Sequence, residues 1–307
     1  GTLTINGQQK TFTKRTRAEL VDMIFLDDQD PEISLTCTTG ITDMSEMFYE
    51  SQFNGDISNW DVSNVTDMTD MFYEASSFNQ PLNNWNVSSV TNMESVFQLA
   101  KNFNQPLSNW DVSNVTNMRA MFTTAEIFNQ SLNNWDVSNV TNMEFMFTSA
   151  YSFNQPLNDW DVSNVSRMRT MFRRAEAFNK PLNNWDVSNV TNMRFMFQQA
   201  EAFNQPLNNW DVSSVTNMRG MFYRAESFNQ DISSWCVKQI PNKPVDFADD
   251  SALLPSNRPS WGTCTFDNPD FTLASNGVTC LCPNAKFDDR GTLTINGEQK
   301  TFTKRNR

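Results

Sequence analysis

A recurring aspartate is the first feature of this sequence whose type and spacing could do chemistry. It directly follows a tryptophan that returns every 25 residues. If successive repeats stack as neighbouring strands, about 4.7–4.9 Å apart, the carboxylates repel one another, and a hard cation with six or more oxygen ligands could lie between them. Hydrogen bonds from the serine two residues later are the competing interpretation, and no EF-hand-like run of ligands is present. The candidate calcium ladder is Asp111, Asp136, Asp161, Asp186 and Asp211; no other cofactor is expected.

Other catalytic chemistry has little support in the composition. Histidine is absent, which removes the commonest general base and metal ligand. No nucleophile, base and orienting group stand out from the repeat, so we expect no enzyme. The net charge of -12 and a pI near 4.5 argue against nucleic acid as a partner. No stretch approaches the ~18 apolar residues of a membrane span, so no membrane insertion is expected in this segment.

Asparagines recur in two columns. Asn54 begins a series that continues every 25 residues to Asn229, and we expect it to form a ladder that satisfies backbone groups in a turn. Several asparagines also fit the N-X-Ser/Thr acceptor pattern, so they could carry glycans in a secreted chain, although the repeat needs these residue types anyway. These candidate glycosylation sites are Asn64, Asn86, Asn114, Asn129, Asn139, Asn164 and Asn189.

The chain has five cysteines, two of them close together at Cys280 and Cys282, which suggests oxidised pairs in an extracellular setting. Their spacing is not a zinc pattern. Cys37 and Cys236 would lie eight coils apart, roughly 38 Å at strand spacing, so they cannot bond to each other. We expect Cys280 or Cys282 of one module to pair with the equivalent of Cys37 in the next. The disulfide candidates are Cys37, Cys236, Cys264, Cys280 and Cys282.

Sequence variation between repeats falls outside the inward-facing columns. Phe145 and Phe195, expected to be exposed beside a row of arginines, give the best candidate contact patch. A solvated face of mixed charge is the alternative. The interaction candidates are Phe145, Phe195, Arg169, Arg173, Arg194, Arg219 and Tyr223.

The repeat itself must position these side chains. With each tryptophan as position zero, alternation at -1 to +3 predicts a short strand with Trp and Val at +2 pointing inward. Apolar residues at +5, +8, +11, +12, +15 and +18 span about 140° of a helical wheel and predict a helix on the core, with Thr at +6 as its N-cap. Thr91/Glu94 and Thr141/Glu144 fit a capping box. The expected fold is an α/β solenoid, a right-handed coil stack of the leucine-rich-repeat plan with one parallel strand and one helix per repeat.

The flanking segments predict caps and a second, longer period. Alternation around Asn6-Gly7 predicts a hairpin, and residues 16 to 25 predict a capping helix. Residues 291–307 repeat residues 1–17 with two changes, so we expect the chain to be one module, plus the start of the next, of a tandem array. The expected divisions are 1–34 (hairpin and capping helix), 35–262 (solenoid, with a degenerate coil at 35–59, full repeats at 60–234 and a terminal coil at 235–262), 263–290 (cysteine-bearing junction) and 291–307 (next module).

The string WDVSNVTNMxxMFxxAxxFNQPLNN resembles the 25-residue repeats of BspA-like leucine-rich-repeat surface proteins. The closing WCVKQIP…NRPSWG is similar to the terminal repeat of that family, and CPNAK…TFTKRNR to a linker between tandem modules. The resemblance covers roughly residues 15 to 262. It implies secreted or cell-surface proteins in adhesion and protein interaction, and brings no active site.

The sequence therefore predicts a structural or adhesive extracellular module, part of a long array that acts as a fibre, spacer or protein-interaction scaffold. Its expected partners are neighbouring copies or modules, the extracellular matrix, a glycan or a protein. The alternative is a cell-surface ectodomain that recognises a glycan, a peptide or Ca²⁺ along the polar strand face.

Overall fold

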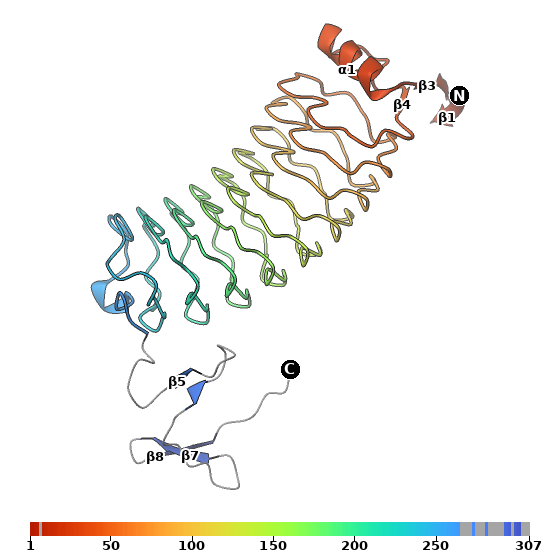
Figure 1. The fold of residues 1–307 in the computed structure, drawn as a ribbon. Helices are drawn as coiled ribbons and strands as arrows, with labels where there is room; N and C mark the ends of the chain where they lie inside the picture. Colours follow the sequence, from red (N-terminus) through yellow and green to blue (C-terminus); the bar gives the residue numbers. More distant parts are fainter. Residues whose placement is uncertain (6–7, 265–271, 274–279, 282–291, 296–297, 302–307) are drawn as a thin grey trace.

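The computed structural model describes residues 1–5, 8–264, 272–273, 280–281, 292–295 and 298–301. Between the N-terminal helix and residue 264 the chain winds as a row of stacked coils, each one 25-residue repeat (Figure 1). Isolated parallel β-bridges join position +7 of each coil to position +7 of the next. They run from Asp43 through Asp67 and onward to Asn217. Equivalent residues of neighbouring coils therefore lie side by side.

The N-terminal cap follows its sequence closely. Strands β1 (Thr2–Ile5) and β2 (Gln8–Thr11) pair antiparallel, which confirms the predicted hairpin; its Asn6-Gly7 turn lies outside the described residues. β3 (Thr13–Lys14) pairs parallel with β4 (Thr36–Cys37). The helix α1 (Arg17–Leu26) begins at a Thr16–Glu19 capping box and buries Leu20 and Ile24 on the first coil. None of the described helices is long and apolar enough to cross a membrane.

The remaining elements lie at the C-terminal end. A short 3-10 helix, η1 (Pro255–Asn257), belongs to the last coil. β5 (Thr272–Leu273) pairs with β6 (Cys280–Leu281), and β7 (Thr292–Ile295) pairs with β8 (Glu298–Thr301), both antiparallel. Thr292 pairs with Thr301 as Thr2 pairs with Thr11. The repeated segment thus forms the same hairpin in the same register.

The helix predicted in each repeat is wrong: residues +9 to +14 form consecutive turns instead. In the coil that starts at Trp185, the amides of Met193, Phe195, Phe197 and Gln199 donate to carbonyls of the next coil at 2.8–2.9 Å. The amides of Met196 and Gln198 donate three residues back, to the carbonyls of Met193 and Phe195 at 3.2 Å, and the Arg194 amide donates to Asn192 Oδ1 at 3.0 Å. Positions +10 and +14 have positive φ, for example Phe195 at 58°. A helix would need every amide for its own carbonyls.

The spacing of the coils explains why a helix does not fit. Successive phenylalanines at +12 stack with ring centroids about 5.7 Å apart, as between Phe147 and Phe172. Packed helices lie 8–10 Å apart, so one helix per coil would force the stack open on that side. A segment in which every second amide bonds to the next coil keeps the narrow spacing. It also places +8, +11, +12 and +15 inside, the same positions that a helical stripe would bury.

The strand predicted at -1 to +3 also takes another form. Trp85 and Val87 point inward and are almost fully buried, as predicted. Their segment is a pair of turns, in which the Trp85 amide donates to the Leu82 carbonyl and the Val90 amide to the Val87 carbonyl. The threonine at +6 is not a helix cap, because the amide and hydroxyl of Thr91 both donate to the Thr66 carbonyl of the previous coil. The predicted capping boxes at Thr91/Glu94 and Thr141/Glu144 are therefore wrong.

The core is one continuous column of stacked side chains. Met at +8 and +11, Phe at +12 and +18, and Trp at zero are buried in every full repeat, apart from Val96 in a methionine position. Trp135 and Trp160 stack with their planes 1° apart. Each indole N–H reaches a backbone carbonyl of the preceding coil, as from Trp185 to Leu157 at 2.8 Å. The inward positions of the repeat are therefore buried in the core, and only the outer faces are accessible to a partner.

Candidate interaction surfaces

The aspartates at +1 are turn acceptors in this structure. Asp186 Oδ1 accepts from the Ser188 amide at 3.1 Å and the Ser188 hydroxyl at 2.6 Å, and the same pattern recurs at Asp61 and Asp111. At Asp136, Asp161 and Asp211 the serine amide donates. Hydrogen bonds from Ser138 lower the pKa of Asp136 below its ordinary value. The serine interactions expected as the competing interpretation are therefore present.

Within the described part of the chain, no group of three or more His, Cys, Asp or Glu side chains could hold a metal ion. The second carboxylate oxygens of Asp111, Asp136, Asp161, Asp186 and Asp211 take no hydrogen bond in the structure, and they form a row on an exposed surface. Calcium at this row remains a prediction.

The asparagine ladder at +19 is confirmed. Asn104 Oδ1 accepts from the Asn129 amide at 3.0 Å, and the equivalent bond joins every successive pair from Asn54 to Asn229. The glutamine at +20 strengthens most steps, since Gln130 Nε2 donates to both the backbone and the side-chain oxygen of Asn104. Leu254 closes the series by donating its amide to Asn229.

The candidate glycosylation sites differ in how their amide nitrogens are used. Asn114, Asn139, Asn164 and Asn189 donate Nδ2 to a serine carbonyl of the preceding coil at 2.7–2.8 Å. Asn129 lies within the +19 ladder. Asn64 and Asn86 are exposed, and neither donates its Nδ2 in the structure. Asn64 and Asn86 are therefore the two candidate sites that are exposed and whose side chains take no part in an inter-coil hydrogen bond.

The two phenylalanines of the proposed contact patch are not exposed as predicted. Both are only partly accessible, because arginines cover their rings. Arg119 and Arg169 lie over Phe145, at 5.3 and 5.1 Å from the ring centroid. Arg194 and Arg219 lie over Phe195, at 4.5 and 5.8 Å. A ring at +10 thus supports the +9 arginines through cation–π contacts, and it offers a partner little apolar area.

The remaining interaction candidates lie on the same segment of the coil. Arg224 stacks on Tyr223 and approaches Asp250 at 3.5 Å. Arg173 is half-buried, without an acidic partner within ion-pair distance in the described chain. Positions +7, +9, +10, +13 and +14 together form one surface, here called the turn face. The structure places Phe145, Phe195, Arg169, Arg173, Arg194, Arg219 and Tyr223 all on this turn face.

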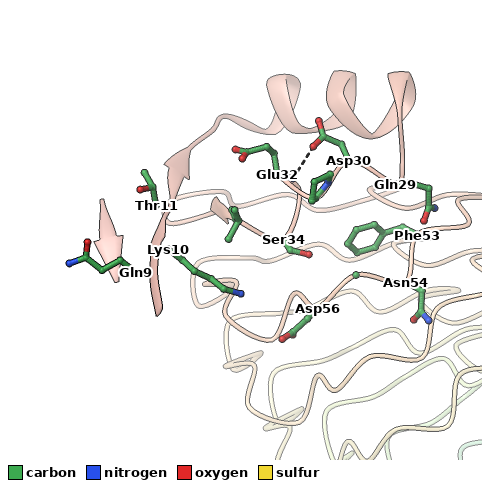
Figure 2. A pocket seen from close by; sticks show the side chains of 13 residues that line it. Gln9, Lys10, Thr11, Gln29, Asp30, Glu32, Ser34, Phe53, Asn54 and Asp56 are labelled. Carbon is green, nitrogen blue, oxygen red and sulfur yellow. Dashed lines mark hydrogen bonds between the residues drawn. The ribbon is translucent and has the colours of Figure 1, made fainter. Parts of the chain in front are cut away.

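A hollow of about 700 Å³ lies between β2 and the first coil. Figure 2 shows Lys10, Asp30, Glu32 and Asp56 around it, with the Glu32 amide donating to Asp30 at 2.8 Å. These charged side chains are solvated, because Lys10, Glu32 and Asp56 are exposed and Asp30 is partly exposed. The hollow offers no arrangement of nucleophile and base to act on a substrate.

Two of the five candidate cysteines pair with each other in the described chain. Cys236 pairs with Cys264, a partnership that links the terminal coil to the start of the junction. Cys37 carries a free thiol, and hydrogen bonds with Thr39 lower its pKa below the ordinary value. The side chain of Cys280 and all of Cys282 lie outside the described residues, so their pairing remains a prediction.

Sequence reasoning missed a property of the turn face that reading down the columns would have found. The first two coils carry acids there, and the coils from Trp160 to Trp210 carry arginines. It also missed that Gly220 sits at the +10 position facing Phe195, where a side chain would overlap the ring.

Comparison with known proteins gives one result. A search of curated proteins finds no match, and no solved structure matches the chain either. One family model matches three times in tandem, at residues 22–126, 105–189 and 158–261, which together span most of the chain. The overlapping matches establish a tandem-repeat protein. The chain belongs to the family described as "Mycoplasma protein of unknown function, DUF285".

Proposed function

We propose that this chain is a structural or adhesive module of an extracellular tandem array, which acts as a spacer or fibre and as a protein-interaction scaffold. The observation that carries the proposal is the second period: β7 and β8 repeat the β1–β2 hairpin in the same register, 290 residues further along the sequence. A repeated cap of this kind is what a string of coil stacks requires, since each stack needs a polar end.

The use of polar side chains within the coils supports this proposal. The asparagines at +19, the aspartates at +1 and the indole N–H groups all bond to neighbouring turns or coils. No nucleophile, base and orienting group converge within the described residues, so we propose no enzymatic activity. The coil stack would serve as a stiff solenoid scaffold, and the resemblance to BspA-like surface proteins favours placement outside the cell.

Electron microscopy of the natural material tests the array directly. Modules joined end to end in rods or filaments are the expected result. Isolated single stacks in the natural material would contradict the proposal. A non-reducing peptide map of a two-module protein adds a chemical test of the junction, where we expect Cys280 or Cys282 to be linked to the next module's counterpart of Cys37. A map with only intramodule bonds would refute the disulfide between modules, but it would not decide whether the modules form an array.

The alternative is a ligand-binding ectodomain, and the row of unbonded carboxylate oxygens at +1 favours it. Calcium or a polar glycan or peptide would bind along Asp111 to Asp211. Calcium titration followed by thermal melting separates the two: a rise in melting temperature with saturable binding supports the alternative. An unchanged melting temperature would eliminate calcium as the ligand.

A further inference from the structure

The turn face carries opposite charges at its two ends. In the first two coils it bears five acids that form no ion pair among the described residues, and all are at least partly accessible. These residues, here called the acidic band, are Glu46, Glu50, Asp67, Asp70 and Glu74. No lysine or arginine occupies the turn-face positions of these two coils.

Four coils further along, the same positions carry arginines. Five of them, in the coils of Trp160 and Trp185, form no ion pair among the described residues. These residues, here called the basic band, are Arg167, Arg169, Arg173, Arg174 and Arg194. Glu176 and Glu201 lie at +16 in the same coils without pairing to them. The Nε atoms of Arg169, Arg173 and Arg194 are buried and have no hydrogen-bond partner.

The two bands cannot neutralise each other within one copy. Their nearest coils are four spacings apart, about 19 Å at strand spacing. That is roughly twice the Debye length of 8–10 Å at physiological salt. The charge of each band is therefore not neutralised by the other band of the same copy. Burial raises the pKa of Asp70 above its ordinary value, and the carboxylates of Glu94 and Glu46 add to the rise, while Arg119 and a hydrogen bond from Ser95 oppose it.

The surface between the bands allows close approach. At the turn-face positions of the coils starting at Trp110 and Trp135 the side chains are mostly small and uncharged. Ala120, Thr148 and Ser149 are buried, and Arg119 is already paired with Glu94. A two-fold axis here would bring the acidic band of each copy against the basic band of the other, twice over.

We propose that two copies of this chain pair side by side and antiparallel through the turn face, acidic band against basic band. This inference deepens the proposed function by naming a second copy as the partner and charge as the basis of recognition. Complementary bands give an interface its register and exclude the parallel arrangement, which would set like charges opposite each other. The net charge of -12 opposes any association, so the local match must overcome it.

Sedimentation velocity of the whole chain tests the pairing with three triple variants. Arg167→Glu/Arg173→Glu/Arg174→Glu reverses the basic band, and Glu46→Lys/Glu50→Lys/Glu74→Lys reverses the acidic band. The control variant, Lys10→Glu/Lys14→Glu/Lys180→Glu, reverses three charges away from the turn face. Circular dichroism verifies that each variant folds.

We expect the unchanged chain and the control to form salt-sensitive dimers, with Kd rising on the order of tenfold between low salt and about 0.5 M salt. Each band variant alone should be monomeric, and an equal mixture of the two should recover a one-to-one dimer. A monomeric unchanged chain at low salt, or a mixture that stays monomeric, would overturn the proposal. End-to-end filaments without dimers would leave the array standing, and dimers without filaments would leave the pairing standing.

Discussion

Side-chain oxygens take the place of backbone acceptors at the bends of each coil. The asparagine at +19 receives an amide of the next coil, and the aspartate at +1 receives the amide two residues later. Both bonds fix a turn that lacks a regular ladder. A polar group left unpaired in such a place costs about 1–3 kcal/mol, so each column is sensitive to substitution.

Asn104 gives a clear test of the +19 ladder. Its Oδ1 accepts from the Asn129 amide and from Gln130 Nε2, both at 3.0 Å. We expect Asn104→Ala to lower the free energy of unfolding by about 1–3 kcal/mol, measured by urea denaturation, because both donors lose their acceptor. Asn104→Asp keeps the oxygen in place and should cost much less. Equal losses in the two variants would contradict the ladder's role.

Asp70 and Asp136 should respond to pH in opposite directions. The folded state raises the pKa of Asp70, so its charge destabilises the fold as pH rises through that pKa, and the effect is absent below the unfolded pKa. The folded state lowers the pKa of Asp136, so its charge stabilises the fold above the unfolded pKa, and that gain is lost as pH falls through the folded value.

Melting temperatures at pH 7 and pH 3 test this pair. At pH 7 Asp70→Asn should melt at a higher temperature than the unchanged chain, and Asp136→Asn at a lower one. Each change in the free energy of unfolding should be less than about 1 kcal/mol, because both groups are partly solvated. Near pH 3 both differences should shrink. Asn86 already occupies the +1 column and accepts from Ser88, so the amide fits there. Shifts of the same sign at pH 7 would contradict the assignment.

The element that distinguishes this coil is the segment from +8 to +14, in which the residues at +10 and +14 are left-handed. Apart from Gly220, non-glycine residues occupy these positive-φ positions in the full repeats, including Thr170 at 64°. A left-handed residue costs roughly 1–2 kcal/mol, which the bonds to the next coil must offset. Only Gly220 takes the conformation without that cost among the +10 residues of the full repeats.

Gly220 has a second reason to be glycine, which a double-mutant cycle can measure. A Cβ there would overlap the ring of Phe195 in the preceding coil. We expect Gly220→Ala to lower the free energy of unfolding by more than the roughly 1–2 kcal/mol of a left-handed residue, and the excess to disappear in a Phe195→Ala background. Ala120 occupies the same column at a φ of 56°, so the backbone can adopt this conformation with alanine. A loss that is equally large without the Phe195 ring would place the whole cause in the backbone.

The sequence predicts the period, the buried columns, the capping helix and the hairpin, because each has a local signal that no other structure shares. Thr16 and Glu19 form a capping box whatever follows them. The helix in each repeat is a different case, because a 3.6-residue stripe and the alternating turns bury the same positions. The narrow spacing between coils decides between them, and it is a property of the stack rather than of one repeat.

The predicted surface failed for a related reason. Phe145 and Phe195 read as exposed on a helical wheel, and only the stacked columns show the arginines of the same and adjacent coils over their rings. The charge segregation on the turn face required comparison of whole coils. Comparison of equivalent positions in successive repeats thus identifies spatial neighbours that the order of residues along the chain does not.

At the scale of the whole molecule, the stack is nearly one-dimensional, since hydrogen bonds and ring contacts link each coil only to the next. Such a molecule changes length without changing its local structure. The acidic and basic bands also keep their order when coils are added or removed between them. The assembly of such molecules can therefore depend on the length of the stack, the order of its charged bands and its end caps.

Removal of one complete coil tests this independence. Deletion of residues 110–134 joins equivalent positions of the flanking coils, so the Asn79–Asn104 ladder can continue to Asn154. We expect a folded chain with a lower urea m-value and a modestly lower melting temperature, because one coil's buried surface is gone. Deletion of residues 110–121 is the matched control, since it leaves half a coil and places buried columns opposite polar ones. If both deletions unfold the chain alike, the 25-residue coil is not the unit of stability, and the fold depends on contacts that reach beyond nearest neighbours.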